Sequence, residues 1–158
     1  MKNINNQYNS IKIGDIEGID YDPNYNIDGY SLPNWHNQIR NKNILELSNK
    51  DIGICLRQNI LLEYILSEVL NRLNHDPTIG DKYDGETLNA LYGIENDFWI
   101  KHNEYVNPTK TLLNDIVLGK LIPENFEWMY ENQKSEFFEL VQKFLKKLNE
   151  ITIVSKEQ

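Results

Sequence analysis

Residues 48–74 read SNKDIGICLRQNILLEYILSEVLNRLN, and this stretch decides the fold. Ser48, followed three residues later by Asp51, matches the pattern of a capping box at a helix start, with Asp in place of the usual Glu. Apolar residues then recur at roughly helical spacing on two sides, which is typical of a central, buried helix. A glycine and a Gln-Asn pair interrupt the pattern. The stretch therefore predicts two helices or one kinked helix, ended by Pro77.

Downstream of this stretch, the sequence predicts three short helices and one long one. Asp84 is placed to cap the first of them. Asn107 followed by Pro108 fits the N-cap and N1 positions of the third. Pro123 is expected to open the long helix. The apolar stripe of that helix has intervals of three, four and seven residues: Phe126, Tyr130, Phe137, Val141, Phe144 and Leu148.

The first 47 residues differ from the rest, being rich in Asn, Asp, Gly, Tyr and Pro without a sustained helical period. A short helix around residues 32–40 is expected there. A brief alternation of isoleucine with polar residues leaves room for one short strand pair. The sequence therefore predicts a mainly all-α single domain over residues 1–158. Its helical bundle (48–154) is overlaid by an irregular or extended N-terminal segment (1–47).

The composition excludes several classes of protein. The chain has 16 Lys and Arg against 24 Asp and Glu, a net charge of -8. Nucleic-acid binders gain most of their affinity from cations facing phosphates, so this balance argues against nucleic acid and against an anionic membrane surface. It is compatible with a basic protein partner. With one cysteine, no visible secretory signal and no apolar membrane span, a cytoplasmic globular protein is the simplest interpretation.

The negative charge is concentrated in two stretches. Residues 12–28 hold five acidic residues against one lysine, and residues 74–104 hold seven against two. The segment between them, 49–73, is neutral. Most single acidic residues are explained by a solvated surface or by capping of a helix. In the N-terminal cluster, however, no acidic residue is explained as a helix cap. The N-terminal cluster is therefore the stronger candidate for a binding surface.

Patterns that carry catalysis are scarce. His36, His75 and His102 share no short spacing, and the chain contains no HExxH, no CxxC and no glycine-rich phosphate loop. His75 beside Asp76 fits a surface or capping residue. Cys55 lies among apolar residues and is expected to be a buried, inert thiol. Paired loop carboxylates could bind a divalent cation, but the calcium-loop motif is absent, so the sequence predicts no enzyme, no metal and no cofactor.

A series of short elements follows in order along residues 45–99. They read LELS (45–48), DI (51–52), LRQNILLEY (56–64), LNRL (70–73), DP (76–77), GDKYDGETL (80–88) and FW (98–99). Together they resemble the helical family of contact-dependent growth inhibition (CDI) immunity proteins. One departure is GETL at 85–88, where the family pattern has Gly-Asp-Leu-Leu.

The resemblance implies a non-catalytic protein that binds and neutralises a toxin domain delivered by a neighbouring bacterial cell, by blocking or deforming its active site. Such toxins are often nucleases, so the expected partner is basic. We expect six motif residues to stabilise the fold and not to contact the toxin: Arg57, Gln58, Tyr83, Asp84, Gly85 and Trp99. Of these, Tyr83 and Trp99 are expected to be anchored in the core. Toxin contacts are expected from acidic residues: Asp15, Glu17, Asp20, Asp22 and Asp28 first, then Asp76, Asp81 and Glu86.

Two alternatives stay open. One is a small helical hydrolase that uses His75 or His102 with a nearby carboxylate, which histidines converging in a cleft would favour. The other is a helical adaptor subunit whose partner surface is the apolar stripe of the last helix. Burial of that stripe in the chain's own core would remove the support for an adaptor.

Overall fold

The computed structural model describes residues 6–157, and α-helices dominate this part of the chain. In order they are α1 (Ile13–Glu17), α2 (Ser31–Ile39), α3 (Asn49–Gln58), α4 (Leu62–His75), α5 (Glu86–Tyr92), α6 (Asn96–Lys101), α7 (Val106–Val117) and α8 (Gln133–Glu157). Short 3-10 helices cover Asn6–Tyr8, Ile44–Glu46 and Asn103–Tyr105. None of the described helices is long and apolar enough to cross a membrane. The all-α prediction is confirmed.

The central pair, α3 and α4, forms as the sequence predicts. The Ser48 hydroxyl accepts a hydrogen bond from the Asp51 N–H, and the Asp51 carboxylate accepts one from the Ser48 N–H. Asn59 and Leu61 both adopt positive φ, at 54° and 59°, so the chain turns sharply between the helices. Residues 65–70 of α4 are all buried. Helix α4 therefore lies at the centre of the core, where it packs against α3 and α7.

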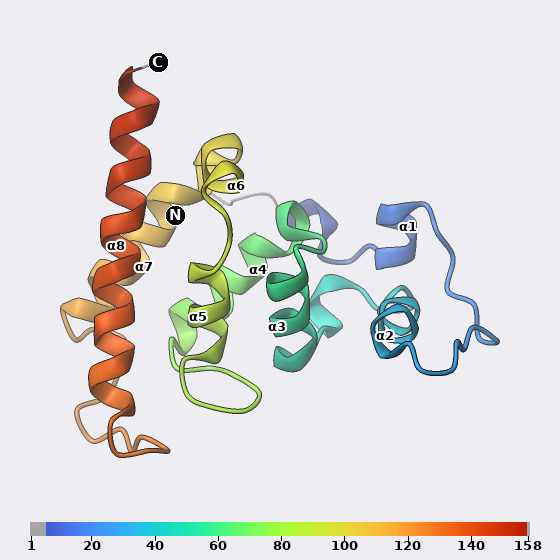
Figure 1. Ribbon diagram of the computed structural model, residues 1–158, viewed down its shortest axis with the longest axis horizontal. Coiled ribbons are helices and arrows are strands. Elements are labelled where there is room, and N and C mark those ends of the chain that lie inside the picture. The colour runs from blue at the N-terminus through green and yellow to red at the C-terminus, as the bar shows by residue number, and fades with distance from the viewer. Residues whose placement is uncertain (1–5, 158) are drawn as a thin grey trace.

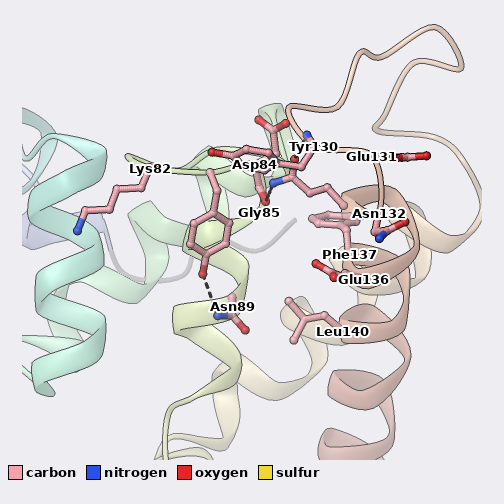
Figure 2. A pocket seen from close by; sticks show the side chains of 12 residues that line it. Lys82, Asp84, Gly85, Asn89, Tyr130, Glu131, Asn132, Glu136, Phe137 and Leu140 are labelled. Carbon is pink, nitrogen blue, oxygen red and sulfur yellow. Dashed lines mark hydrogen bonds between the residues drawn. The ribbon is translucent and has the colours of Figure 1, made fainter.

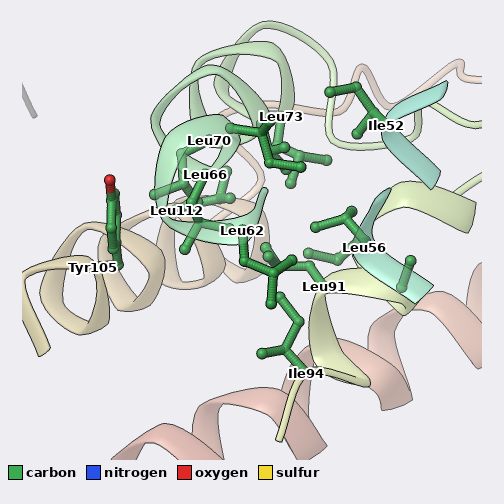
Figure 3. Close-up of a cluster of buried hydrophobic side chains, with 14 of the residues drawn as sticks. Ile52, Leu56, Leu62, Leu66, Leu70, Leu73, Leu91, Ile94, Tyr105 and Leu112 are labelled. Atoms are coloured by element: carbon green, nitrogen blue, oxygen red, sulfur yellow. The ribbon is translucent and has the colours of Figure 1, made fainter. Parts of the chain in front are cut away.

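The helices pack side by side around α4. Helix α8 runs along one end of the molecule, α1 and α2 lie at the other end, and α3, α4 and α5 lie between them (Figure 1). Helix α7 packs against α8, and α3 packs against α5. One hydrophobic cluster reaches from Ile13 in α1 to Ile151 in α8. Figure 3 shows part of it, in which side chains from several helices meet: Ile52, Leu56, Leu66, Leu73, Leu91 and Leu112.

The N-terminal segment is more helical than the sequence predicts. The helix expected around residues 32–40 forms as α2. Ile13, placed in a possible strand by its alternation with Ile11, instead starts α1 with a fully buried side chain. No strand forms within residues 6–157, where pairing is limited to an isolated antiparallel bridge between Lys12 and Asn43. Burial of Ile13 against the helical body outweighs the local alternation.

The last helix begins at Gln133, so the prediction that Pro123 opens it is wrong. In the preceding segment one hydrogen bond reaches a distant part of the chain, and the others are local turn contacts. The Met129 N–H donates to the Asp84 carboxylate at 2.9 Å, and the Tyr130 N–H donates to the Gln133 side chain at 3.2 Å. From Phe137 onward the predicted stripe is correct, and its members are buried in the chain's own core: Phe137, Val141, Phe144 and Leu148.

Two other helix starts also differ from the prediction. Asp84 does not cap α5; the N-cap is Gly85, at φ 82°, and the Asp84 carboxylate binds Met129. A Cβ on Gly85 would lie 2.6 Å from Cδ2 of Phe137, so only glycine fits there. Helix α7 begins at Val106, so Pro108 is the third residue of the helix instead of the first. Proline is tolerated there because the first amides of a helix lack partners within the helix.

Candidate functional site: an acidic loop held on helix α2

The first acidic stretch forms the loop between α1 and α2, together with the outer face of α1. Asp15 on α1 is exposed, and so are Asp20, Asp22 and Asp28 in the loop. Three exposed apolar side chains interleave with them along the chain: Ile19, Ile27 and Tyr30. We call these seven residues the N-terminal acidic surface. Exposed apolar side chains rimmed by charge are typical of protein interaction sites.

Two asparagines of α2 hold this loop in place. Asn37, with 1% of its surface exposed, accepts a hydrogen bond from the Asp22 N–H at 3.0 Å and donates one to the Asp22 carbonyl at 2.8 Å. Asn34 makes the same pair of bonds with Ile27, both at 2.9 Å. Positions i and i+3 lie on one face of a helix, so both amides point at the loop. The loop backbone is therefore fixed by the chain itself.

Within the loop, local turn chemistry adds to these clamps. The Asp22 carboxylate accepts a hydrogen bond from the Asn24 N–H at 2.9 Å, the geometry of an Asx turn with Pro23 at its centre. Gly18 ends α1 at φ 70°, where its N–H bonds to the carbonyl of Gly14. These local bonds add to the clamps in fixing the backbone of the loop.

Glu17 has an internal role and does not face outward with its neighbours. Both of its carboxylate oxygens lie 2.9 Å from Nε2 of His36, and Nε of Arg40 lies 3.7 Å from Oε1. This cluster joins α1 to α2. Glu17 was among the predicted toxin contacts, and its part-buried, bonded position makes it a support of the surface instead.

Asp51 anchors α2 to the helical body. Its buried carboxylate accepts hydrogen bonds from Trp35 Nε1 at 2.9 Å, Lys42 Nζ at 2.9 Å and the Ser48 N–H at 3.0 Å. Burial raises the pKa of Asp51, but the hydrogen bonds from Trp35, Lys42 and Ser48 together lower it by more than burial raises it. The pKa of Asp51 therefore lies below its ordinary value. The ionised carboxylate thus links the acidic surface to α3.

Of the second predicted group, Glu86 turns inward. It is 6% exposed; its Oε1 lies 3.4 Å from Nη1 of Arg57, and its Oε2 accepts hydrogen bonds from the N–H groups of Asp81 and Lys82, at 2.6 and 2.8 Å. Glu86 therefore organises the α4–α5 loop (residues 76–85), and its buried carboxylate does not face a toxin as the sequence predicted. Asp81 is exposed, and the carboxylate of Asp76 binds Thr78.

The other motif residues divide between core and surface. Trp99 is fully buried and packs on Phe144, with ring centroids 5.7 Å apart. Tyr83 is 37% exposed, so its prediction as a core anchor is wrong. Its hydroxyl accepts a hydrogen bond from Asn89 at 3.0 Å on the outside of α5. Gln58 is exposed at the end of α3. Arg57 reaches the carboxylate of Glu86, with Nη1 3.4 Å from Oε1.

The histidines do not form a common site. His36 bonds to Glu17; Nδ1 of His75 lies 2.8 Å from the carbonyl of Asn71; the ring of His102 stacks on Phe98 at 4.6 Å. Cys55 is fully buried, and burial raises its thiol pKa to about 12. Within residues 6–157, no group of three His, Cys, Asp or Glu could hold a metal ion. His102 does lie near two carboxylates, with Nδ1 3.5 Å from Glu104 and Nε2 3.9 Å from Glu63, but no second histidine joins it, so the convergence that would favour the hydrolase is not found. Burial of the α8 stripe from Phe137 onward removes the support for the adaptor.

Comparison with known proteins identifies a family. The sequence model of a family described as CDI immunity proteins matches residues 15–108. A search of curated proteins and a search of solved structures each found no match. The matched region begins at Asp15 and ends at Pro108, near the start of α7. It therefore contains the acidic loop, its asparagine clamps and the Arg57–Glu86 pair, whereas α8 lies beyond it.

Proposed function

The chain belongs to the CDI immunity proteins, a family that neutralises CDI toxins, and we propose that it does so without catalysis, by covering the active site of one toxin with its N-terminal acidic surface. The toxin domain is delivered by a neighbouring bacterial cell. It meets this protein in the cytoplasm. The favoured toxin is a nuclease with a basic substrate site.

The fixed geometry of the acidic loop is the observation that carries this proposal. Asn34 and Asn37 hold Ile27 and Asp22 in place with four hydrogen bonds, so the loop is ordered by its own chain. Ordering a flexible loop on binding costs free energy for each immobilised residue. A loop that is ordered beforehand avoids that cost. Pre-organisation is what a tight inhibitor needs at its contact surface.

The chemistry of the loop suits a nuclease. A nuclease binds phosphates with cationic side chains, and carboxylates can occupy the same positions. The charge of the loop also attracts a basic partner over a distance and speeds association at low salt. Ile27 and Tyr30 add apolar contacts, and tyrosine is enriched among the residues that dominate binding energy. Charge and apolar anchors together fit a substrate cleft better than a flat surface.

Co-purification with the polypeptide encoded immediately upstream tests the proposal. A stable complex that forms with the wild-type chain, and that suppresses nuclease activity of the polypeptide in a gel assay, supports it. Absence of a complex, together with undiminished nuclease activity at excess immunity protein, contradicts it. A complex with a toxin that has no nuclease activity would keep the immunity function and reject only the nuclease assignment.

A further inference from the structure

A groove of about 760 Å³ lies between the α4–α5 loop and the start of α8 (Figure 2). Side chains from segments far apart in sequence form its two sides. Asn89 of α5 lies on one side, and Glu136 and Leu140 of α8 lie on the other. Tyr83 and Tyr130 line it as well. The groove is separate from the N-terminal acidic surface described above.

Both walls of the groove are fixed by hydrogen bonds. The Gln133 side-chain amide donates to the Asp84 carbonyl at 3.0 Å, and its oxygen accepts from the Tyr130 N–H at 3.2 Å. The Asp84 carboxylate accepts from the Met129 N–H at 2.9 Å. The ring of Phe137 lies directly against Gly85. These contacts join the walls and hold the groove open without a ligand.

The groove has the chemistry of a cation site. Asp84, Glu131 and Glu136 supply three carboxylates against one ammonium group, that of Lys82. Lys82 extends away from Glu136 in Figure 2, so it does not neutralise that side. Tyr130 is 61% exposed at the rim. Aromatic faces attract guanidinium and ammonium groups, and the attraction adds to that of nearby carboxylates.

An extended polypeptide fits this groove better than an isolated ion. Phe137 and Leu140 give it an apolar lining beside the charges. A segment with one cationic side chain and apolar neighbours would meet both kinds of surface. The α8 wall lies beyond residues 15–108, the part that matches the family. This wall is therefore suited to recognise a feature of one toxin instead of a feature that all members' toxins share.

We propose that the groove binds an extended cationic segment of the toxin, with an Arg or Lys side chain beside Glu136 and Tyr130. This inference rests on the proposed function and adds a second contact to it. In Figure 1 the α4–α5 loop and the segment before α8 lie at the lower left, whereas α1, α2 and the loop between them lie at the right-hand end of the molecule. The groove and the acidic loop are thus two separate contact regions, and a toxin that contacts both must span the helices between them.

The test uses the full chain with Glu136→Lys and Tyr130→Ala, both at exposed positions, and with Glu150→Lys as a control elsewhere on α8. Affinity for the upstream-encoded polypeptide is measured by surface plasmon resonance. We expect Glu136→Lys to weaken binding about tenfold, Tyr130→Ala to weaken it less, and Glu150→Lys to leave it unchanged. A complex that tolerates all three changes overturns the groove assignment alone, whereas no complex with the wild-type chain defeats the proposed function.

A second measurement works without the toxin. An acetylated, amidated Gly-Leu-Arg-Leu-Gly peptide is titrated into ¹⁵N-labelled protein, with Gly-Leu-Glu-Leu-Gly as control. We expect the Arg peptide alone to shift the side-chain amide signals of Asn89 and Asn132, and Glu136→Lys to abolish the shifts. Equal shifts from both peptides, or none, overturn the proposal. Dimerisation of the wild-type chain that Glu136→Lys abolishes would also overturn it, by assigning the groove to a second copy.

Discussion

Asn37 holds Asp22 from both sides: its amide oxygen accepts from the Asp22 N–H at 3.0 Å, and its amide nitrogen donates to the Asp22 carbonyl at 2.8 Å. The two residues belong to different parts of the chain, α2 and the loop before it. A buried side chain thus fixes the backbone of a residue whose carboxylate is exposed. In our account, this relationship makes the acidic loop a ready binding surface, because it sets the position of Asp22 before the toxin arrives.

Removing the clamp should loosen the loop. Asn37→Ala deletes both hydrogen bonds to Asp22, and we expect a loss of about 1–2 kcal/mol in the free energy of unfolding. Hydrogen exchange at the Asp22 amide should become faster, and toxin affinity should fall through a higher dissociation rate. Gln38→Ala, on the exposed side of the same helix, is the matched control. Unchanged exchange at Asp22 in Asn37→Ala would show that the clamp does not order the loop.

Charge reversal in the loop should slow association with the toxin. Asp20→Lys/Asp22→Lys changes the charge by four units, and we expect the association rate to fall by about tenfold or more at low salt, with a weaker salt dependence. Asp22→Asn controls for the Asx turn, because asparagine makes the same turn. Asp97→Lys/Glu150→Lys makes an equal charge change at exposed positions elsewhere. Equal association rates for the two double variants, in stopped-flow fluorescence, would refute electrostatic steering by the loop.

The pair Glu86 and Arg57 should contribute unequally to stability. Glu86→Ala leaves the N–H groups of Asp81 and Lys82 without their acceptor, so we expect a loss of about 1–3 kcal/mol. Arg57→Ala removes a part-exposed contact of 3.4 Å and should cost below about 1 kcal/mol. Urea unfolding monitored by circular dichroism measures both. A larger loss for Arg57→Ala would mean that the ion pair, and not the loop amides, sets the role of Glu86.

Acid should weaken the attachment of α2 to the body through Asp51. The folded-state pKa of Asp51 lies below its ordinary value of 3.8, since the hydrogen bonds from Trp35, Lys42 and Ser48 outweigh burial. A lowered folded pKa means that the stabilisation is complete above about pH 5 and is lost as pH falls through 3.8 and below. Asp51→Asn should therefore reduce the slope of urea stability between pH 5 and pH 2. An identical slope in wild type and Asp51→Asn would contradict this role.

Local signals in the sequence predict much of the helical body. Three features of α3 and α4 depend only on neighbouring residues, so the sequence pattern predicts them. They are the capping box of Ser48 and Asp51, the break near Asn59 and the end of α4 at His75. The start of α8 at Gln133 was missed because Met129 and Asp84, 45 residues apart, bond to each other. Such a pairing leaves no periodic trace in either segment.

The candidate site shows the same division. The exposed carboxylates of the loop could be found from charge counting alone. The role of Asn34 and Asn37 could not, because asparagine in a polar segment predicts a turn, whereas here each side chain pairs with a backbone 7 or 15 residues away. From the sequence alone, Glu86 is predicted to be an exposed acidic residue like the others. Its burial depends on how the α4–α5 loop folds back over it, which no local pattern specifies.

The most direct test of the central claim is protection of growing cells. The upstream-encoded polypeptide is expressed in a bacterial host together with limiting, equal amounts of the wild-type chain, Asp20→Lys/Asp22→Lys or Asp97→Lys/Glu150→Lys. Growth rate is the readout. We predict that the wild type and the Asp97→Lys/Glu150→Lys control restore growth, whereas reversal in the acidic loop does not. Failure of the wild-type chain to restore growth, or full protection by the loop variant, would contradict the account.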